Sequence, residues 1–196
     1  MALPQIILLN GTTSAGKTSI AHALQARLPG LWLHVGVDHF IQMTPLKFHG
    51  APEGFQFAPQ PDGALPLNIG PTGQRVLAAF RTSVASIARS GANVIVDEVI
   101  LSPKTLGAWL DALQNLDVFF VGVHCSLEEA QRREQARGDR GIGQVRAQFD
   151  IVHAGADYDF TIDTTADSPE SSAGAIAAAL EKRVTPTAFD RLRARS

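Results

Sequence analysis

Short hydrophobic runs, rich in β-branched side chains, recur along the chain and alternate with longer stretches of helical periodicity. Because these runs are apolar on both faces, they are typical of parallel strands covered by helices. They predict strands at about residues 5–10, 31–36, 93–97, 118–123 and 158–162. The other stretches predict helices at 17–28, 38–43, 73–90, 103–114, 127–137, 143–153 and 170–183. This alternation predicts an α/β protein, with a five-stranded parallel sheet in the middle of three αβα layers.

The length of 196 residues allows one domain of this kind and is short for two. We assign residues 1–185 to that domain. The segment 45–71 interrupts the pattern with six of the eleven prolines. Neither helical nor strand periodicity persists there, and a loop of this length favours a functional role over a simple connection. Residues 186–196 form a basic tail, for which terminal disorder is expected, with a frayed basic helix as the alternative.

Composition narrows the possible functions. With 45% hydrophobic and 18% charged residues the chain is an ordinary globular protein, and its formal net charge of −2 provides no basic field for nucleic-acid binding. Cys125 is the only cysteine, which excludes an internal disulfide, and its apolar surroundings predict burial. The first residues contain neither a charged leader nor an apolar run of membrane-spanning length. We therefore expect a cytoplasmic protein without a membrane partner.

Residues 11–18 match the phosphate-binding pattern G-x-x-x-x-G-K-[ST] at every fixed position. They lie between the first predicted strand and a predicted helix, as this motif requires. Glycines let the backbone turn its N–H groups toward a polyphosphate, and the helix adds its positive end. Lys17 is expected to reach the β- and γ-phosphates, and Thr18 to bind Mg²⁺. The expected nucleotide-binding residues here are Gly11, Thr12, Thr13, Ser14, Ala15, Gly16, Lys17, Thr18 and Ser19.

Acidic residues follow two predicted strands, whose carboxyl ends share one edge with the phosphate-binding loop. Asp97 ends an apolar run, and we expect it to hold Mg²⁺ together with Thr18, with Glu98 as the competing candidate. Asp38 follows the second strand, where a base would meet an acceptor hydroxyl in line with the γ-phosphate. The alternative role of Asp38, compatible with the first, is to cap the short helix after it.

Arg133, Arg137 and Arg140 recur at helical spacing, which places them on one face if the helix extends that far. Such a face in a lid of residues 133–143 could close over the triphosphate and neutralise charge that develops during transfer. Arg140 is accordingly expected among the nucleotide-binding residues. Arg132 is expected to point toward the surface. The alternative is a solvated face that pairs with neighbouring glutamates.

The acceptor side is poor in cations, because residues 39–74 contain no arginine and a single lysine, Lys47. A phosphorylated acceptor would need bidentate cationic partners here, so the scarcity favours an uncharged, partly apolar alcohol. Aromatic residues either line this site or anchor the loop to the core. They are Phe40, Phe48, Phe55 and Phe57.

The histidines lack metal-ligand spacing, so a zinc site is not expected. His153 lies shortly before Tyr158 and Asp159 and is expected to be structural. Residues 163–165, after the last predicted strand, either supply main-chain contacts to adenine or form an ordinary loop.

Six stretches, taken in order, resemble the chloramphenicol phosphotransferases: residues 7–18, 32–38, 43–47, 91–97, 133–140 and 152–165. The phosphate-binding loop alone indicates only a large superfamily, whereas the Gly-Val-Asp and Ala-Arg-Gly-Asp-Arg stretches are much more specific. The resemblance implies a nucleotide-kinase-like P-loop fold and an ATP-dependent kinase that phosphorylates a primary hydroxyl of the antibiotic. It also implies Asp38 as the base, with Arg133 and Arg137 in the lid. The chain departs from the family's pattern at His39 and over residues 50–72.

The sequence therefore predicts a phosphotransferase that uses ATP and Mg²⁺ and acts on a small neutral alcohol, such as chloramphenicol or a similar antibiotic. Its expected catalytic residues are Lys17, Asp38, Arg133 and Arg137. One alternative is a nucleoside or nucleotide kinase, which the scarcity of cations on the acceptor side disfavours. Another is a nucleotide-gated switch without enzymatic activity. The sequence contains no Asn-Lys-x-Asp motif for guanine, and it does not indicate an oligomeric state.

Overall fold

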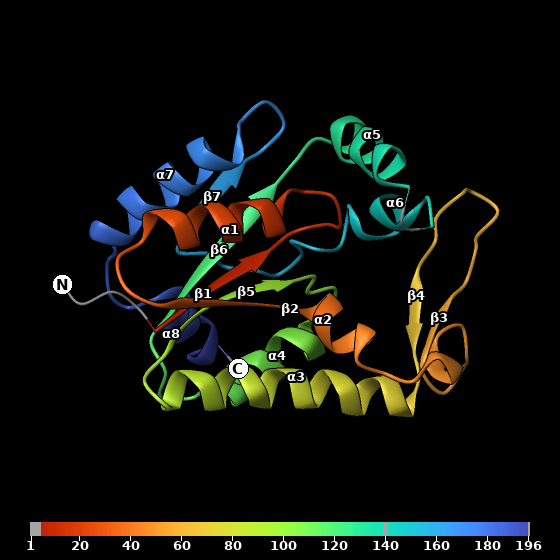
Figure 1. The fold of residues 1–196 in the computed structure, drawn as a ribbon, viewed down its shortest axis with the longest axis horizontal. Coiled ribbons are helices and arrows are strands. Elements are labelled where there is room, and N and C mark those ends of the chain that lie inside the picture. Colours follow the sequence, from red (N-terminus) through yellow and green to blue (C-terminus); the bar gives the residue numbers. More distant parts are fainter. Residues whose placement is uncertain (1–4, 139–140, 196) are drawn as a thin grey trace.

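The computed structural model describes residues 5–138 and 141–195. Its centre is a sheet of five parallel strands in the order β2–β5–β1–β6–β7 (Figure 1). All four neighbouring pairs in this sheet are parallel, so the predicted α/β fold is confirmed. The strands are β1 (Ile6–Asn10), β2 (Trp32–Gly36), β5 (Asn93–Glu98), β6 (Val118–His124) and β7 (Phe160–Asp163).

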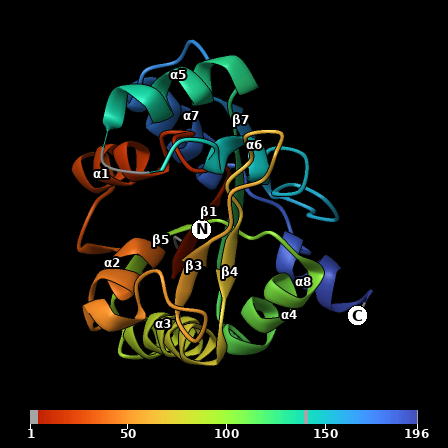
Figure 2. The same cartoon turned by 90° about the vertical axis from the view of Figure 1, so that its right-hand side faces the viewer.

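Helices cover both faces of the sheet (Figure 2). Helices α1 and α7 lie on one face, and α3, α4 and α8 lie on the other (Figure 1). Helices α2, α5 and α6 lie around the carboxyl ends of the strands, so they surround the edge that carries the phosphate-binding loop. The helices are α1 (Lys17–Arg27), α2 (Val37–Gln42), α3 (Pro71–Arg89), α4 (Pro103–Ala112), α5 (Leu127–Arg137), α6 (Gln144–Gln148), α7 (Pro169–Glu181) and α8 (Ala188–Arg193).

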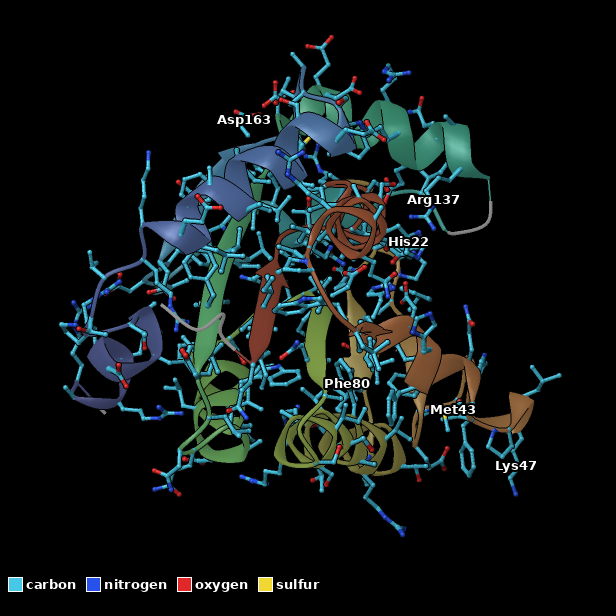
Figure 3. The ribbon with its side chains drawn as sticks, turned by 60° about the vertical axis from the view of Figure 1, so that its left-hand side comes forward. His22, Met43, Lys47, Phe80, Arg137 and Asp163 are labelled. Atoms are coloured by element: carbon cyan, nitrogen blue, oxygen red, sulfur yellow. The ribbon has the colours of Figure 1, made fainter. Side chains whose placement is uncertain are left out.

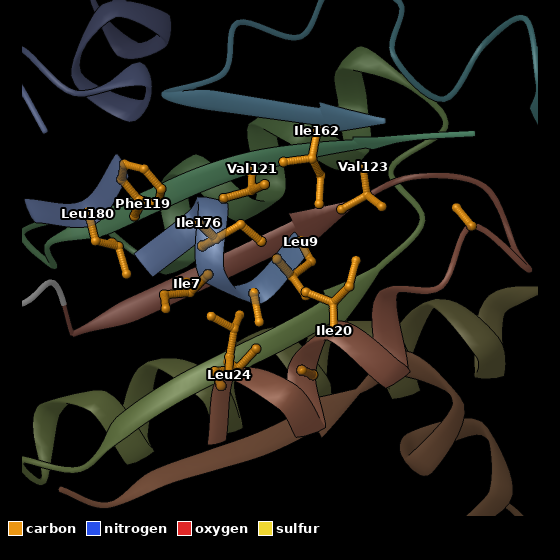
Figure 4. Close-up of a cluster of buried hydrophobic side chains, with 14 of the residues drawn as sticks. Ile7, Leu9, Ile20, Leu24, Phe119, Val121, Val123, Ile162, Ile176 and Leu180 are labelled. Atoms are coloured by element: carbon orange, nitrogen blue, oxygen red, sulfur yellow. The ribbon is translucent and has the colours of Figure 1, made fainter. Parts of the chain in front are cut away.

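The two faces of the sheet belong to separate hydrophobic cores, because successive side chains of a strand point in opposite directions. Ile7 of β1 shares one core with Leu24 of α1 (Figure 4). Leu8 shares the other with Phe80 of α3 and Trp109 of α4. Every residue of β1 is buried, which explains why its sequence is apolar at consecutive positions. The strand before the phosphate-binding loop is therefore held firmly between both layers.

The segment 45–71 is more regular than the sequence predicts. It contains a short 3-10 helix, η1 (Leu46–Phe48), and an antiparallel hairpin of β3 (Phe55–Phe57) and β4 (Leu67–Ile69). The expectation of a loop without strands is wrong here, because three-residue strands are too short to produce a periodic pattern. A further difference is that α6 ends at Gln148, whereas the predicted helix extends to residue 153.

The expectation of terminal disorder is wrong for α8. A capping box between Thr187 and Asp190 begins this helix, and Phe189 is buried against Phe120 with ring centroids 5.4 Å apart. Arg191 forms an ion pair with Asp157 at 2.8 Å. The sequence signal for this helix is weak, because its apolar face has only three residues, Ala188, Phe189 and Leu192, which alternate with arginines. These three residues complete the hydrophobic core beside β6.

Cys125 is buried, as predicted. Among residues 5–138 and 141–195, none of the helices combines the length and the hydropathy needed to cross a bilayer.

Candidate active site

The phosphate-binding loop joins β1 to α1, and two of its glycines meet different requirements. Gly16 has a φ of 89°, a left-handed conformation that glycine adopts without strain, and it precedes the first turn of α1. Gly11 is required by packing, because a Cβ atom there would lie 2.3 Å from the carbonyl oxygen of Val123. The loop is therefore packed against β6, and the amino end of α1 opens toward the expected phosphates.

Three predicted residues meet at the carboxyl end of β5. The Thr18 hydroxyl donates to Asp97 Oδ2 at 2.5 Å, and Lys17 Nζ lies 3.7 Å from Asp97 Oδ1. Lys17 also donates to the carbonyl oxygen of Thr12 at 2.7 Å. The buried ammonium thus lies inside the loop, where phosphate oxygens could take the place of these oxygen partners.

The pair of Thr18 and Asp97 fits Mg²⁺. Their two oxygens are hard ligands, and Mg²⁺ at phosphoryl-transfer sites takes few protein ligands, completing its shell with phosphate oxygens and water. Within the part of the chain that the structure describes, no group of three or more His, Cys, Asp or Glu side chains could hold a metal without such help.

Glu98 is directed to the opposite face of β5 and is not beside Thr18. Its carboxylate is buried and accepts hydrogen bonds from Val99 N at 2.8 Å and Trp109 Nε1 at 3.2 Å. Burial raises the pKa of Glu98 to about 7, against the influence of these donors and of Arg81 on α3. Arg81 lies outside residues 39–74, so it does not change the scarcity of cations within that segment. Burial lowers the pKa of Arg81.

Asp38 lies in the first turn of α2, directly after β2. The helix begins at Val37 and its cap residue is Gly36, whose N–H donates to His39 Nδ1 at 3.1 Å. The alternative role of Asp38 as the capping residue is therefore wrong. Its half-buried side chain lines the same cavity as the phosphate-binding loop.

That cavity has a volume of about 350 Å³ and brings most of the predicted site together. It lies between the loop, α2, the end of β5 and α5. Of the other predicted loop residues, Thr12 and Ala15 contribute carbonyl oxygens to contacts with neighbouring side chains. Arg140 lies outside the described residues. The lining residues are Thr13, Ser14, Gly16, Lys17, Thr18, Ser19, Val37, Asp38, Asp97, Val99, Arg132, Arg133, Ala136 and Arg137.

Arg133 is held in place by neighbours at both ends of its guanidinium group. Its Nε donates to Glu129 Oε1 at 2.7 Å, and Nη2 donates to the carbonyl oxygen of Thr164 at 2.6 Å. Hydrogen bonds from Arg132 and Arg133 lower the pKa of Glu129 to about 2. The sequence offers two alternatives for Arg133, pairing with a glutamate or a position at the nucleotide site. Arg133 does both, because it pairs with Glu129 and also lines the cavity.

The predicted arginine face is shorter than expected. Helix α5 ends at Arg137, because Gly138 adopts a left-handed φ of 66°. Arg132 was predicted to point to the surface; its side chain is 68% exposed and yet it lines the cavity. The described arginines of α5 that line the cavity are Arg132, Arg133 and Arg137.

A second, smaller pocket of about 280 Å³ adjoins the loop on the side of β7. Thr164, a predicted candidate for adenine contacts, lines it together with Arg133 and Gly16. The Ser172 hydroxyl of α7 is buried in its wall and has no hydrogen-bond partner among the described residues. Sequence reasoning missed Ser172, since a serine early in a helix is usually a structural residue.

A network of side-chain hydrogen bonds surrounds Asn10, the residue directly before the phosphate-binding loop. Asn10 Nδ2 donates to the carbonyl oxygen of Val152 and to Tyr158 Oη, both at 2.8 Å, and Tyr158 Oη lies 2.7 Å from His153 Nδ1. His153 also stacks on His124 at 3.9 Å. The structural role expected for His153 agrees with these contacts.

Phe40, Phe48, Phe55 and Phe57 are not among the residues that line the larger cavity, so of the two roles expected for them the structure favours anchoring. Phe40 packs on Phe80 at 5.0 Å and Phe55 is buried, so both anchor the segment to the core. Phe57 is 42% exposed. Figure 3 shows Lys47 at the outer end of this segment, well away from Arg137. Its ammonium instead lies over the ring of Phe48, 5.2 Å from the centroid.

His34 was also missed. Its Nε2 lies 3.9 Å from Asp97 Oδ2 and has no hydrogen-bond partner among the described residues. Burial lowers the pKa of His34, which favours a neutral ring beside Asp97. A histidine within a strand gives no sequence signal for this position, because the contact depends on the pairing of β2 with β5.

Residues 4–181 match the family model described as chloramphenicol phosphotransferase-like protein. Two proteins of Mycobacterium tuberculosis, from the strains CDC 1551 and H37Rv, are provisionally named O-phosphotransferases. Each is 36% identical over 199 residues, which cover 97% of this chain and 88% of the relative.

Solved structures with a similar fold include several kinases. A sugar kinase from Janibacter has a TM-score of 0.66 at 17% identity, covering 91% of this chain and 95% of that one. A gluconokinase from Sinorhizobium meliloti has a TM-score of 0.65 at 16% identity, covering 93% and 94%. A tunicamycin resistance protein from Deinococcus radiodurans has a TM-score of 0.60 at 21% identity, covering 90% and 95%. At these identities the likeness establishes the fold.

Proposed function

The chain belongs to the chloramphenicol phosphotransferase-like family, and from this premise we propose that it transfers the γ-phosphoryl group of ATP to a hydroxyl of a small neutral alcohol. Family and fold together make it an ATP-dependent phosphotransferase acting on a small molecule. The names of its M. tuberculosis relatives support an oxygen acceptor. We further propose a cytoplasmic location, where ATP is available, and no nucleic-acid partner.

One observation carries the proposal: a single cavity is lined by Asp38, by Lys17 of the loop and by arginines of α5. In-line transfer needs a group that orients or deprotonates the hydroxyl on the side facing the γ-phosphate. Asp38 would do this from α2. Lys17 and the N–H groups of the loop would hold the phosphates, while Arg133 and Arg137 would neutralise charge on the transferring group.

Thr18 and Asp97 would hold Mg²⁺, which when bound would neutralise phosphate charge. The contact between these two side chains supports this role, since it leaves two oxygens next to each other at the edge of the cavity.

For the acceptor we propose chloramphenicol or a similar hydroxylated antibiotic, so that O-phosphorylation would confer resistance. The family's description supports this choice. So does the position of Lys47, which lies at the surface and away from α5, because a charged acceptor would need cations directed into the site (Figure 3).

The test is to incubate the protein with Mg²⁺ and ATP and a panel of hydroxylated antibiotics, and to search by mass spectrometry for one added phosphoryl group. We expect a phosphorylated product with chloramphenicol or a close analogue. Nucleosides and nucleoside monophosphates belong in the same panel, because their phosphorylation would favour a nucleoside or nucleotide kinase. Tight nucleotide binding without any phosphorylated product would instead favour a nucleotide-gated switch.

A further inference from the structure

Helix α6 lies between α5 and the β3–β4 hairpin (Figure 2), and none of its residues lines the cavity. At its carboxyl end, Gln148 Oε1 accepts a hydrogen bond from Thr13 N of the phosphate-binding loop at 2.7 Å. At its amino end it meets both the β3–β4 hairpin and α5. These three connections make α6 the common support of the nucleotide side and the acceptor side.

The hairpin tip packs closely on the main chain before α6. Leu65 N donates to the carbonyl oxygen of Gly143 at 2.9 Å, and Arg146 Nε lies 3.4 Å from Asp62 Oδ2. A Cβ atom on Gly143 would lie 2.2 Å from the carbonyl oxygen of Gly63. The hairpin therefore contacts this segment through backbone and cannot shift without disturbing it.

Glu134 joins the same segment to α5. Its side chain is buried, only 2% exposed, and both carboxylate oxygens accept main-chain hydrogen bonds at 2.9 Å, from Gly143 N and Val145 N. Glu134 lies between Arg133 and Arg137 on α5. The segment at Gly143–Val145, on which the hairpin packs, is thus held by a carboxylate of α5. That carboxylate lies in the same part of α5 as the arginines that line the cavity.

We propose that Glu134 is a positioning residue for phosphoryl transfer, which couples the acceptor-side hairpin to the arginines of α5 through Gly143 and Val145. This inference rests on the proposed function, in which Arg133 and Arg137 act on the phosphates. Burying a carboxylate costs solvation free energy, whereas burying an apolar side chain does not. In Glu134 this cost is offset by hydrogen bonds from two main-chain N–H groups. Glutamine could satisfy only one of those donors, because its NH₂ group would face the other N–H.

The first test measures amide hydrogen exchange without and with Mg²⁺ and a non-hydrolysable ATP analogue. The hairpin does not line the nucleotide cavity, so coupling predicts that the analogue slows exchange at 55–69 in the wild type. Glu134→Gln should abolish this slowing while it retains analogue affinity within a few-fold. Leu65→Pro, which removes the N–H that donates to the carbonyl oxygen of Gly143, should act in the same way. Glu128→Gln, on the exposed face of α5, is the matched control and should behave as the wild type.

The second test is kinetic. Glu134→Gln should lower kcat by about 2- to 30-fold, the range expected for a change in coupling, with a smaller effect on the KM for ATP. A purely structural role predicts a lower melting temperature but an unchanged kcat for the folded fraction.

The inference is overturned if the analogue does not slow hairpin exchange in the wild type, or slows it equally in Glu134→Gln. Failure of the proposed function has a different signature, namely wild-type protein that binds nucleotide and phosphorylates no alcohol. The exchange measurement needs no acceptor, so it tests the coupling through Glu134 separately from the proposed activity.

Discussion

At the scale of single residues, the site is defined by a few side chains whose backbones are fixed by the sheet. Asp38 lies where β2 gives way to α2, and Asp97 lies within β5, paired in register with Gly36. Neither carboxylate depends on a long loop for its position. Substitutions that keep the shape of these side chains should therefore change chemistry more than structure.

Asp38→Asn tests the proposed base directly. The amide keeps the size of the side chain but cannot accept the proton of the acceptor hydroxyl, so kcat should fall by about 10²–10⁴-fold. The affinity for ATP should change little, because Asp38 is assigned to the acceptor. Steady-state kinetics and nucleotide titration give both quantities. Asp111→Asn, at an exposed position of α4, is the matched control. Wild-type turnover in Asp38→Asn would contradict the assignment.

His153 should make stability depend on pH. Burial, together with His124 and Lys17, lowers the pKa of His153 from 6.5 to about 4 in the folded protein. Between these values the unfolded chain binds the proton and the folded protein does not, so this contribution is complete above pH 6.5 and is lost as the pH falls toward 4.

The measurement is the free energy of unfolding in urea at several pH values. Wild-type protein should lose more stability than His153→Gln as the pH decreases through that window, whatever the absolute stability of the variant. Parallel curves for the two proteins would show that His153 keeps an ordinary pKa in the folded state.

At the scale of secondary structure, the sequence predicts the long elements well and the short ones poorly. Strands β1 and β6 are apolar over at least four consecutive residues, and helices such as α3 repeat their apolar positions over several turns. The three-residue strands β3 and β4 carry no such period, and their pairing depends on contacts of Gly54 and Gly70 with neighbouring backbone. Such contacts leave no local pattern.

Helix α8 provides a test at this scale. Phe189 is 1% exposed and packs edge-to-face on Phe120, so Phe189→Ala should lower the free energy of unfolding by about 3–5 kcal/mol. Chemical denaturation measures this difference. Leu31→Ala, which truncates an exposed leucine, is the control and should have a small effect. If the tail were disordered, as its sequence suggests, both substitutions would be nearly neutral.

At the scale of the whole molecule, the site exists because several elements converge at one edge of the sheet. Motif spacing predicts Lys17, Thr18 and Asp97, since the loop and the strand end are fixed by the topology of parallel strands. It does not predict that Glu134 meets Gly143, because that contact depends on the turn between α5 and α6. The sequence therefore predicts the residues expected to bind phosphate and metal. It does not predict contacts such as that of Glu134 with Gly143, which hold the surrounding segments in place.

This convergence predicts that nucleotide and metal stabilise the folded protein together. A ligand that binds only the folded state at 100 times its Kd adds about 2.7 kcal/mol to the free energy of unfolding. An ATP analogue should raise the melting temperature, and Mg²⁺ should raise it further, because Thr18 and Asp97 offer oxygens at the same edge. Asp97→Asn should keep the rise due to nucleotide and lose most of the increment due to Mg²⁺, whereas Asp111→Asn should keep both. Calorimetry with and without a chelator separates the two, and an undiminished Mg²⁺ increment in Asp97→Asn would remove that carboxylate from the metal site.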